Sequence, residues 1–270
     1  MKLSIITVTL NCERVLEKTI QSVLSQEYAD LEYILVDGGS RDGTCEIARK
    51  YSAEFQNIRW ISEPDAGISD AFNKGISMST GDVIGILNAD DRYSPGALDT
   101  VATAVSAHPE CDVFHGDILR YQGDTPLFLL KPSDVECTIW HEMPLNHPAT
   151  FVRRSAYQRA GLFDVTLKIA MDYDMMLRLY AAGSRFCYID EVLAEMNYGG
   201  VSDTQVLAGL QEVYDVSVRH GYPPWKARYW MQRNRLLRMV KNLIRKLGLH
   251  SLLHLHPKFR ALPPEKDLTL

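Results

Sequence analysis

Two kinds of feature are scarce or missing in this 270-residue sequence, and each absence narrows the choice of function. No apolar run approaches the roughly 18 residues that a membrane-spanning helix needs. Cysteine is sparse, odd in number and without a CxxC pair, so neither a disulfide framework nor a cysteine zinc site is indicated. The pattern is typical of reduced residues in a cytoplasmic protein. The five residues are Cys12, Cys45, Cys111, Cys137 and Cys187.

Two familiar nucleotide-binding loops are also missing. The glycine-rich turn at residues 38–43 lacks the Gly-Lys-Ser/Thr ending of a P-loop and the spacing of a dinucleotide fingerprint. ATPase and dehydrogenase chemistry are therefore not supported. Internal repeats and low-complexity segments are absent as well. A chain that is 46% hydrophobic and 23% charged can bury a sizeable core, as one α/β domain with an appendage.

The most informative feature that is present is a pair of adjacent carboxylates after an apolar strand. Residues 83–87 are predicted to form a buried strand, and Asp90 and Asp91 emerge at its carboxyl end. Open α/β sheets bind ligands at that edge. Neighbouring carboxylates repel each other unless a cation lies between them, and oxygen ligands suit Mg²⁺ or Mn²⁺, which suits a diphosphate. The alternative is a solvated Asp-Asp turn before Pro95.

Strands and helices of the same kind precede this pair. A β-branched strand is predicted within residues 3–11, an amphipathic helix over 16–24, and a second strand over 31–37 that ends on Asp37. Alternating strands and helices, with carboxylates at the strand ends, are typical of a Rossmann-like nucleotide-binding sheet built from βαβ units. The predicted fold class is therefore α/β.

A further helix is predicted after Gly67, with apolar side chains on one face. That stripe leaves three charged residues for solvent or for a ligand: Asp65, Asp70 and Lys74. An ordinary amphipathic helix with solvated charges is an equally good interpretation.

Six motifs occur in a fixed order along the chain. They are SIITVTLN (4–11), VDGGSRDGT (36–44), EPDAGISDAFNKG (63–75), GDVIGILNADD (81–91), HPATFVRR (147–154) and AMDYDMMLRL (170–179). With these motifs the sequence closely resembles the family 2 glycosyltransferases, in the bacterial branch that builds O-antigen and exopolysaccharide repeat units. The resemblance covers roughly residues 3–202. It implies a GT-A fold, a nucleotide-diphosphate sugar donor, a divalent metal and inversion at the anomeric carbon.

The resemblance also implies roles for residues that match the motifs. Asp37 stands where a carboxylate holds the base or ribose, whereas Gly38 replaces a second Asp that contacts uracil in many relatives, so the base stays open. The donor site implied in this way consists of Val8, Asn11, Asp37, Asp65, Asp70, Lys74, Asn88 and Asp90.

The metal site and the general base follow from the same resemblance. Asp90 and Asp91 match the pair that holds Mn²⁺ or Mg²⁺, although Asn88 replaces an acidic residue and supplies a neutral oxygen. Asp172 matches the general base, although Met171 replaces the Glu that usually precedes it. Asp174 is expected to interact with the positive end of the following helix. His147 is either a contact to diphosphate or acceptor, or a packed histidine.

The charge is divided unevenly along the chain. Residues 1–202 are expected to form the catalytic domain, with a nucleotide half (1–91) and an acceptor half (92–202), and 203–270 to form a helical basic region. Ten Lys and Arg residues and no acid lie between Trp225 and Pro264, whereas residues 1–224 carry 18 bases and 32 acids. A basic amphipathic helix of this kind can lie on an anionic membrane. The alternative is packing on the catalytic domain or a partner subunit of an oligomer. The acidic domain disfavours nucleic acid.

Together these features predict a metal-dependent inverting glycosyltransferase. It is expected to add one sugar from a nucleotide-sugar donor, UDP-linked by preference, to a polyprenyl-linked saccharide at the inner face of a bacterial membrane. One alternative is a sugar-1-phosphate nucleotidyltransferase, although the Arg- and Lys-bearing glycine loop of such enzymes is missing after Asn11. The other is a catalytically degenerate scaffold, which only Asn88 and Met171 support.

Overall fold

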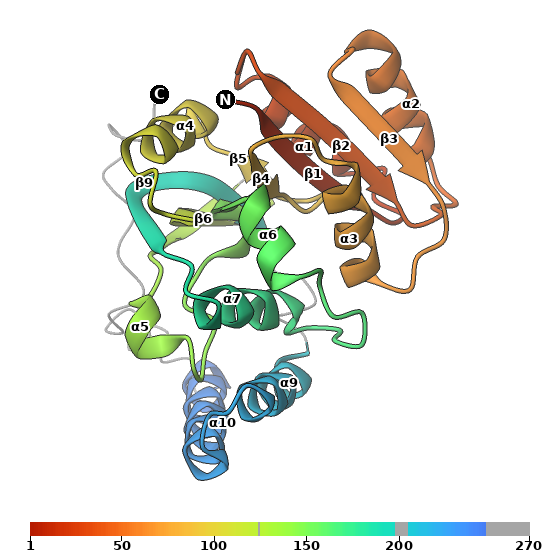
Figure 1. Cartoon of the computed structure of the whole chain (residues 1–270). Coiled ribbons are helices and arrows are strands. Elements are labelled where there is room, and N and C mark those ends of the chain that lie inside the picture. Colours follow the sequence, from red (N-terminus) through yellow and green to blue (C-terminus); the bar gives the residue numbers. More distant parts are fainter. Residues whose placement is uncertain (124, 198–204, 247–270) are drawn as a thin grey trace.

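One mixed β-sheet with helices on both faces organises the structure (Figure 1). The computed structural model describes residues 1–123, 125–197 and 205–246. The strand order is β3-β2-β1-β4-β8-β6-β9-β5, and β7 pairs with β6. The elements are β1 (Leu3–Thr9), α1 (Leu16–Leu24), β2 (Leu31–Asp37), α2 (Thr44–Glu54), β3 (Ile58–Ser62), α3 (Ile68–Met78), β4 (Val83–Ile86), β5 (Arg92–Tyr93), α4 (Ala97–Ala107), β6 (Val113–Gln122), β7 (Thr125–Leu130), α5 (Val135–Thr138), η1 (His147–Ala149), β8 (Thr150–Arg153), α6 (Arg154–Ala160), α7 (Met171–Ala181), β9 (Phe186–Asn197), α9 (Val206–Arg219) and α10 (Pro224–Lys246).

The first four strands are parallel, and their register gathers their carboxyl ends at one edge. Thr9 of β1 pairs with Asp37 of β2, so these two strands end together. On the other side of β1, Ile6 pairs with Ile86, the last residue of β4. The segment after β4, which contains Asp90 and Asp91, therefore continues past the end of β1. This arrangement confirms the predicted α/β order of strands and helices in residues 1–91.

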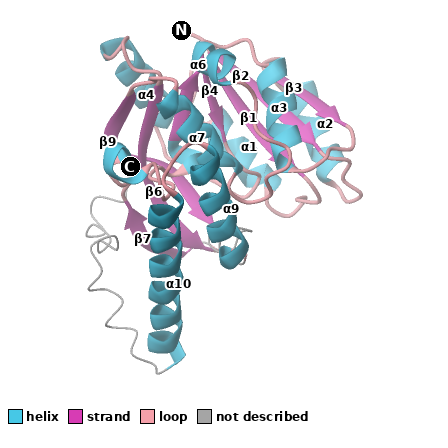
Figure 2. Cartoon of the chain, turned by 60° about the horizontal axis from the view of Figure 1, so that its bottom comes forward, coloured by secondary structure: helices cyan, strands magenta, loops and turns pink. Residues whose placement is uncertain are grey.

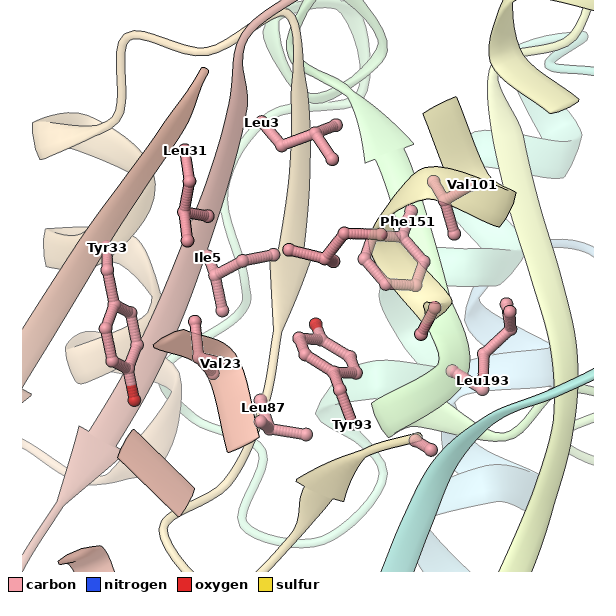
Figure 3. Packing of buried hydrophobic residues seen from close by; sticks show 14 of the residues in the cluster. Leu3, Ile5, Val23, Leu31, Tyr33, Leu87, Tyr93, Val101, Phe151 and Leu193 are labelled. Atoms are coloured by element: carbon pink, nitrogen blue, oxygen red, sulfur yellow. The ribbon is translucent and has the colours of Figure 1, made fainter. Parts of the chain in front are cut away.

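Alternation along the buried strands feeds two apolar cores, one on each face of the sheet. Leu3 and Ile5 of β1 belong to the core under α1, α2 and α4, part of which Figure 3 shows. Ile6 and Val8 belong to the opposite core, under α3, α6 and α7. Covered on both faces, β1 can consist almost entirely of apolar and β-branched residues.

The second half of the sheet joins the first through antiparallel β8. Gly85 of β4 makes this joint possible, because a Cβ there would lie 2.7 Å from both the Phe151 ring and the Tyr93 hydroxyl. The rings of Tyr93 and Phe151 stack across this glycine, with centroids 5.5 Å apart. Beyond β8, strand β6 runs parallel to β9, and β5 pairs antiparallel with β9.

The carboxyl-terminal helices lie against α7. Helix α9 packs on α7, and Figure 2 shows α10 beside α9, extending away from the layers of the sheet. The ring of Trp230 on α10 stacks on His141 at 3.8 Å between centroids. Within the described ranges, no helix combines the length and apolar character needed to cross a bilayer.

Candidate active site

The two predicted metal carboxylates lie in the turn after β4. Asp91 is 2% exposed, whereas Asp90 reaches the surface. Helix α1 fixes the turn, because the Thr19 hydroxyl donates to the carbonyls of Ala89 at 2.7 Å and Asp91 at 2.8 Å. The pair is therefore held rigidly at the edge predicted from the sequence.

The surroundings of Asp91 disfavour the charged form of its side chain. Burial raises its pKa to about 8, and the negative charge of Asp90 adds to that effect. Hydrogen bonds from the backbone N–H of Asn197 (3.2 Å) and the amide of Asn88 (3.3 Å) oppose the rise without cancelling it. Desolvation by the surrounding protein also raises the pKa of Asp90, although that side chain is exposed. An ionised pair at this turn calls for a nearby cation.

Asn88 provides a third oxygen at the same turn. Its Oδ1 atom is buried and has no hydrogen-bond partner in the described structure, while its amide nitrogen donates to Asp91. No group of three or more His, Cys, Asp or Glu side chains suited to a metal occurs in the described ranges. Two carboxylates and an amide oxygen nevertheless fit Mg²⁺ or Mn²⁺, which proteins commonly hold with one or two carboxylates plus substrate phosphates.

Arg120 is a residue of this site that the sequence did not reveal. It lies on β6 and is 6% exposed, and its positive charge lowers the pKa of both Asp90 and Asp91. Its Nη1 donates to Met196 Sδ at 2.9 Å. The sequence shows Arg120 only as an arginine in a strand-like run at 113–122. That pattern does not reveal which distant residues lie beside it.

Asp37 is held by an unusually complete set of donors. Its carboxylate accepts hydrogen bonds from the backbone N–H groups of Gly39 and Ser40, at 3.0 and 2.9 Å, and from the hydroxyls of Ser62 and Thr9, at 2.7 and 3.1 Å. Burial alone would raise its pKa, but hydrogen bonds outweigh burial and lower it to about 2; the Ser40 hydroxyl, which also donates to this carboxylate, contributes most, followed by the Ser62 hydroxyl and the Ser40 N–H. Asp37 thus shapes the glycine turn beside the predicted donor site.

Replacing Asp37 with asparagine is expected to lower the free energy of unfolding by about 1–2 kcal/mol at neutral pH, after allowance for solvent screening. The folded pKa of about 2 lies below the unfolded value of about 3.9, so the stabilisation is present above the unfolded value and is lost as pH falls through the folded one. Urea unfolding of both proteins across this range measures the difference. The prediction would be contradicted if the two proteins differed in unfolding free energy by as much at the lowest pH as at neutral pH.

Asn11 and Val8 play unequal parts at the end of β1. Asn11 adopts a positive φ of 50°, and its Oδ1 accepts a hydrogen bond from the backbone N–H of Arg41 at 2.9 Å. Its own N–H donates to Ser40 Oγ at 2.8 Å, which fastens this loop to the glycine turn. The Val8 side chain is buried in the core, so only its backbone remains for the predicted ligand contact.

Asp65 lies against the glycine turn, whereas Asp70 and Lys74 bond within their own segment. A Cβ on residue 38 would collide with the Asp65 carboxylate, so this side chain takes the space that a residue larger than glycine would need. Lys74 pairs with Glu63 at 3.1 Å and with Asp70 at 3.5 Å. Of the three charges predicted from this segment, Asp65 is therefore the one that meets the turn after Asp37.

Asp172, the predicted base, is the second residue of α7. Its Oδ1 accepts from the backbone N–H of Tyr173 at 2.9 Å. Burial raises its pKa, and the nearby His147 opposes that rise. Burial in turn lowers the pKa of His147, whose ring stacks on Phe72 at 5.4 Å. Helix η1, which begins at His147, packs against β4, the strand that precedes Asp90 and Asp91.

The neighbouring Asp174 has a structural role. It is 2% exposed, and its two oxygens contact Arg178 Nε at 2.8 Å and His220 Nε2 at 3.1 Å. These contacts tie α7 to itself and to α9. The sequence predicted only a favourable interaction with the helix terminus and gave no sign of these partners.

Glu212 of α9 is a second residue that the sequence analysis missed. Its carboxylate accepts hydrogen bonds from the backbone N–H groups of Lys168, Ile169 and Ala170, at 3.2, 2.9 and 2.8 Å. These three residues lead directly into α7. Glu212 therefore fixes the start of the helix that presents Asp172.

Comparison with known proteins identifies the family of this chain. The model of the family "Glycosyl transferase family 2" matches residues 4–161. The chain is 30% identical over 230 residues to a PGL/p-HBAD biosynthesis glycosyltransferase of Mycobacterium bovis, covering 81% of this chain and 86% of that protein. It is 31% identical over 211 residues to the O-antigen biosynthesis protein RfbC of Myxococcus xanthus, covering 77% of this chain and 16% of that protein.

Solved structures show the same fold. The mannosyltransferase PcManGT from Pyrobaculum calidifontis, in complex with GDP-Man and Mn²⁺, superposes with a TM-score of 0.66 at 17% identity, covering 95% of this chain and 81% of that one. S. aureus TarS in complex with UDP-GlcNAc gives a TM-score of 0.64 at 18% identity, covering 86% and 70%. The chain therefore belongs to the family 2 glycosyltransferases and has the GT-A fold.

Proposed function

We propose that this glycosyltransferase moves a sugar, with inversion, from a nucleotide-diphosphate donor to a hydroxyl of a lipid-linked saccharide. The observation that carries the proposal is the buried Asp91 beside Asp90 and the orphaned Asn88 oxygen, in the turn that follows β4. We assign leaving-group chemistry to this turn and base chemistry to Asp172, whose neighbour His147 begins η1. Asp172 accepts the proton of the acceptor hydroxyl as that oxygen bonds to the anomeric carbon.

The leaving group takes the electron pair of the broken bond between the anomeric carbon and the phosphate oxygen. Mn²⁺ or Mg²⁺ held by Asp90 and Asp91, with Asn88 beside them, supplies Lewis-acid neutralisation of the diphosphate when bound. Arg120 contributes a fixed positive charge on the same side, which favours a ligand of high negative charge.

A UDP-linked donor is the form we propose, with Asp37 and Asp65 at the base and ribose. Asp65 supports this assignment because its carboxylate occupies the space above Gly38. Turnover should be tested by product release from UDP-, GDP- and dTDP-linked sugars, with and without Mn²⁺. Mn²⁺-dependent hydrolysis or transfer from one donor class supports the proposal. Absence of turnover with every donor would instead favour the alternative of a catalytically degenerate scaffold.

The acceptor is proposed to be lipid-linked because α10 exposes a surface suited to a bilayer. Its outer side carries apolar residues that are 45–71% exposed, with exposed bases on both flanks. This outer face of α10 consists of Trp225, Tyr229, Leu236, Met239 and Val240, flanked by Lys226, Arg228, Arg233 and Arg235. Such a face suits the anionic inner surface of a bacterial membrane.

The inner side of α10 agrees with the packing alternative for the basic tail, because the ring of Trp230 stacks on His141. Positions six apart, such as 230 and 236, lie on different sides of an α-helix, because the repeat is 3.6 residues. Packing therefore involves the inner side of α10, and we propose that the outer face of α10 binds the membrane. The predicted residues 247–270 lie outside the described residues.

Replacing both Leu236 and Val240 with glutamate is expected to weaken binding to anionic vesicles by at least tenfold. The variant lacks the two apolar side chains that would insert at the bilayer surface, and its two added negative charges are repelled by the anionic lipids. Each nearby base contributes on the order of 1 kcal/mol, so wild-type binding should fall steeply with salt. Co-sedimentation at low and high salt measures both effects. The matched control is Leu207→Glu on α9, where the side chain is 62% exposed. Equal, negligible sedimentation of every protein would dismiss membrane binding.

A further inference from the structure

The segment that leads into α7, residues 161–170, is held by α3 and by α9. Asn73 of α3 bonds the backbone of Phe163 twice, because its amide donates to the carbonyl at 2.9 Å and its Oδ1 accepts from the N–H at 2.8 Å. From α9, Arg219 pairs with Asp164 at 2.8 Å. This lead-in segment is therefore fixed by two helices before α7 begins.

Close packing brings α9 against the end of the lead-in segment. A Cβ on Gly209 would lie 3.0 Å from the side chain of Ile169, which leaves little room for a larger residue there. One turn further along α9, the Glu212 carboxylate accepts hydrogen bonds from three successive backbone N–H groups, the last of them from Ala170 at 2.8 Å. Ala170 caps α7, and Asp172 follows two residues later. Glu212 thus holds the backbone immediately before the predicted base.

Among the described residues, the Glu212 carboxylate is bonded by backbone N–H groups and by no Lys or Arg side chain. Hydrogen bonds to an ionised group are stronger than those between neutral groups, so the charge itself helps to hold the segment. Because no paired base cancels this charge, it also remains available to act on neighbouring groups.

The charge of Glu212 acts on Asp172. Burial is the main cause of the raised pKa of Asp172, while Glu212 raises it further and His147 of η1 opposes the rise. Asp174, on the same turn of α7, is already paired with Arg178. A carboxylate with a higher pKa binds a proton more strongly, so Glu212 makes Asp172 a stronger base.

We propose that Glu212 is a positioning residue of the transfer reaction, which holds Asp172 in place for the acceptor hydroxyl and sets a negative charge beside it. This assignment rests on the proposed function, because it takes Asp172 as the base. A reacting group that moves by about 1 Å can cost roughly 10²-fold in rate, so the hold on the lead-in segment matters for turnover. Helix α9 lies after residue 161, where the match to the family model ends, and yet it belongs to the catalytic unit.

Glu212→Gln separates the charge from most of the hydrogen bonding, because glutamine keeps one oxygen for the N–H groups of Ile169 and Ala170. Titration of the Asp172 carboxyl by ¹³C NMR, assigned with Asp172→Asn, measures the effect of the charge. The midpoint is expected to move to lower pH in the variant, since a group that raises the pKa of Asp172 has been removed. A role confined to holding the backbone would leave this midpoint unchanged.

Turnover is measured with Mn²⁺ and whichever of the UDP-, GDP- and dTDP-linked sugars wild type consumes. Glu212→Gln should lower kcat severalfold and move the acidic limb of its pH profile to lower pH, while the Kd of UDP stays the same. Glu212→Ala, which also loses the hydrogen bonds, should lower kcat by about tenfold or more. Thermal melting shows whether each variant folds, and Glu212→Gln decides the question if Glu212→Ala does not fold.

The matched control is Asp215→Asn, which removes the same charge from an exposed position of α9. Asp215 accepts a hydrogen bond from Gln211 of its own helix at 3.1 Å. Its substitution should leave the Asp172 midpoint and kcat unchanged. The proposal is overturned if Glu212→Gln behaves as wild type in either measurement, if its effect falls on the Kd of UDP and not on kcat, or if Asp215→Asn shifts the midpoint equally.

Asp172→Asn in the same turnover assay tests the proposed function separately. Near-normal turnover of Asp172→Asn would overturn the proposed base, and the role of Glu212 in the reaction with it. An inactive Asp172→Asn beside a Glu212→Gln of wild-type kcat and midpoint would leave the base in place and overturn the positioning role alone.

Discussion

Asp172→Asn is expected to lower kcat by roughly 10²-fold or more while leaving the Kd of the donor unchanged. Asparagine keeps the size of the side chain but cannot take the proton of the acceptor hydroxyl. Burial already disfavours the charge of Asp172, so this variant should not lose stability. Steady-state kinetics and donor titration measure the two effects. Near-normal turnover would remove Asp172 from the mechanism.

Asp174→Asn, two residues away, provides the contrasting control. That carboxylate is buried between Arg178 and His220, so its loss should cost about 3 kcal/mol of unfolding free energy, as breaking a buried pair does. The two carboxylates on this turn of α7 are thus distinguished by the quantity that changes, which is kcat for Asp172 and the free energy of unfolding for Asp174. Equal effects of both variants on stability would contradict the roles assigned here.

Asp91→Ala should abolish Mn²⁺-dependent binding of UDP, because the buried carboxylate is the strongest ligand available at the turn after β4. The fold should remain intact, since the charge of Asp91 is itself unfavourable where it lies. Calorimetry with and without EDTA measures the loss, and Asp99→Ala on α4 is the control for removal of an exposed carboxylate.

Asn88→Asp tests the same turn by adding a carboxylate, whereas Asp91→Ala removes one. An added carboxylate at the position of the orphaned Oδ1 should tighten Mn²⁺ binding severalfold if residue 88 faces the cation. UDP binding that is unchanged in Asp91→Ala and insensitive to EDTA would contradict a metal at this site.

Local sequence patterns were enough to predict the parallel strands and the helices of residues 1–91. Strands such as β1 and β2 are short apolar runs with polar ends, and parallel strands must bring those ends to one edge. The positions of Asp37 and of the Asp90–Asp91 pair follow from this rule. The family motifs supplied Asp172, which no periodicity would have singled out.

Contacts between distant segments could not be predicted in the same way. Arg120 approaches Asp91 only because β6 follows β8 in the sheet order, and that order depends on pairing between strands far apart in the chain. Glu212 looks like any exposed acid of an amphipathic helix until α9 is placed on α7. The substitution at Gly38 likewise makes sense only once Asp65 lies over it.

Because Glu212 holds the start of α7, it limits where the chain can be truncated. A truncation after residue 202, where the resemblance to the family ends, would remove the acid that holds the start of the catalytic helix. The smallest autonomous unit should instead run through α9 and the inward contact of Trp230. Because Met231 and Asn234 also lie against α9, beside Leu210 and Val213, that unit should extend to Asn234. The remainder of α10 can then be replaced without disturbing the start of α7.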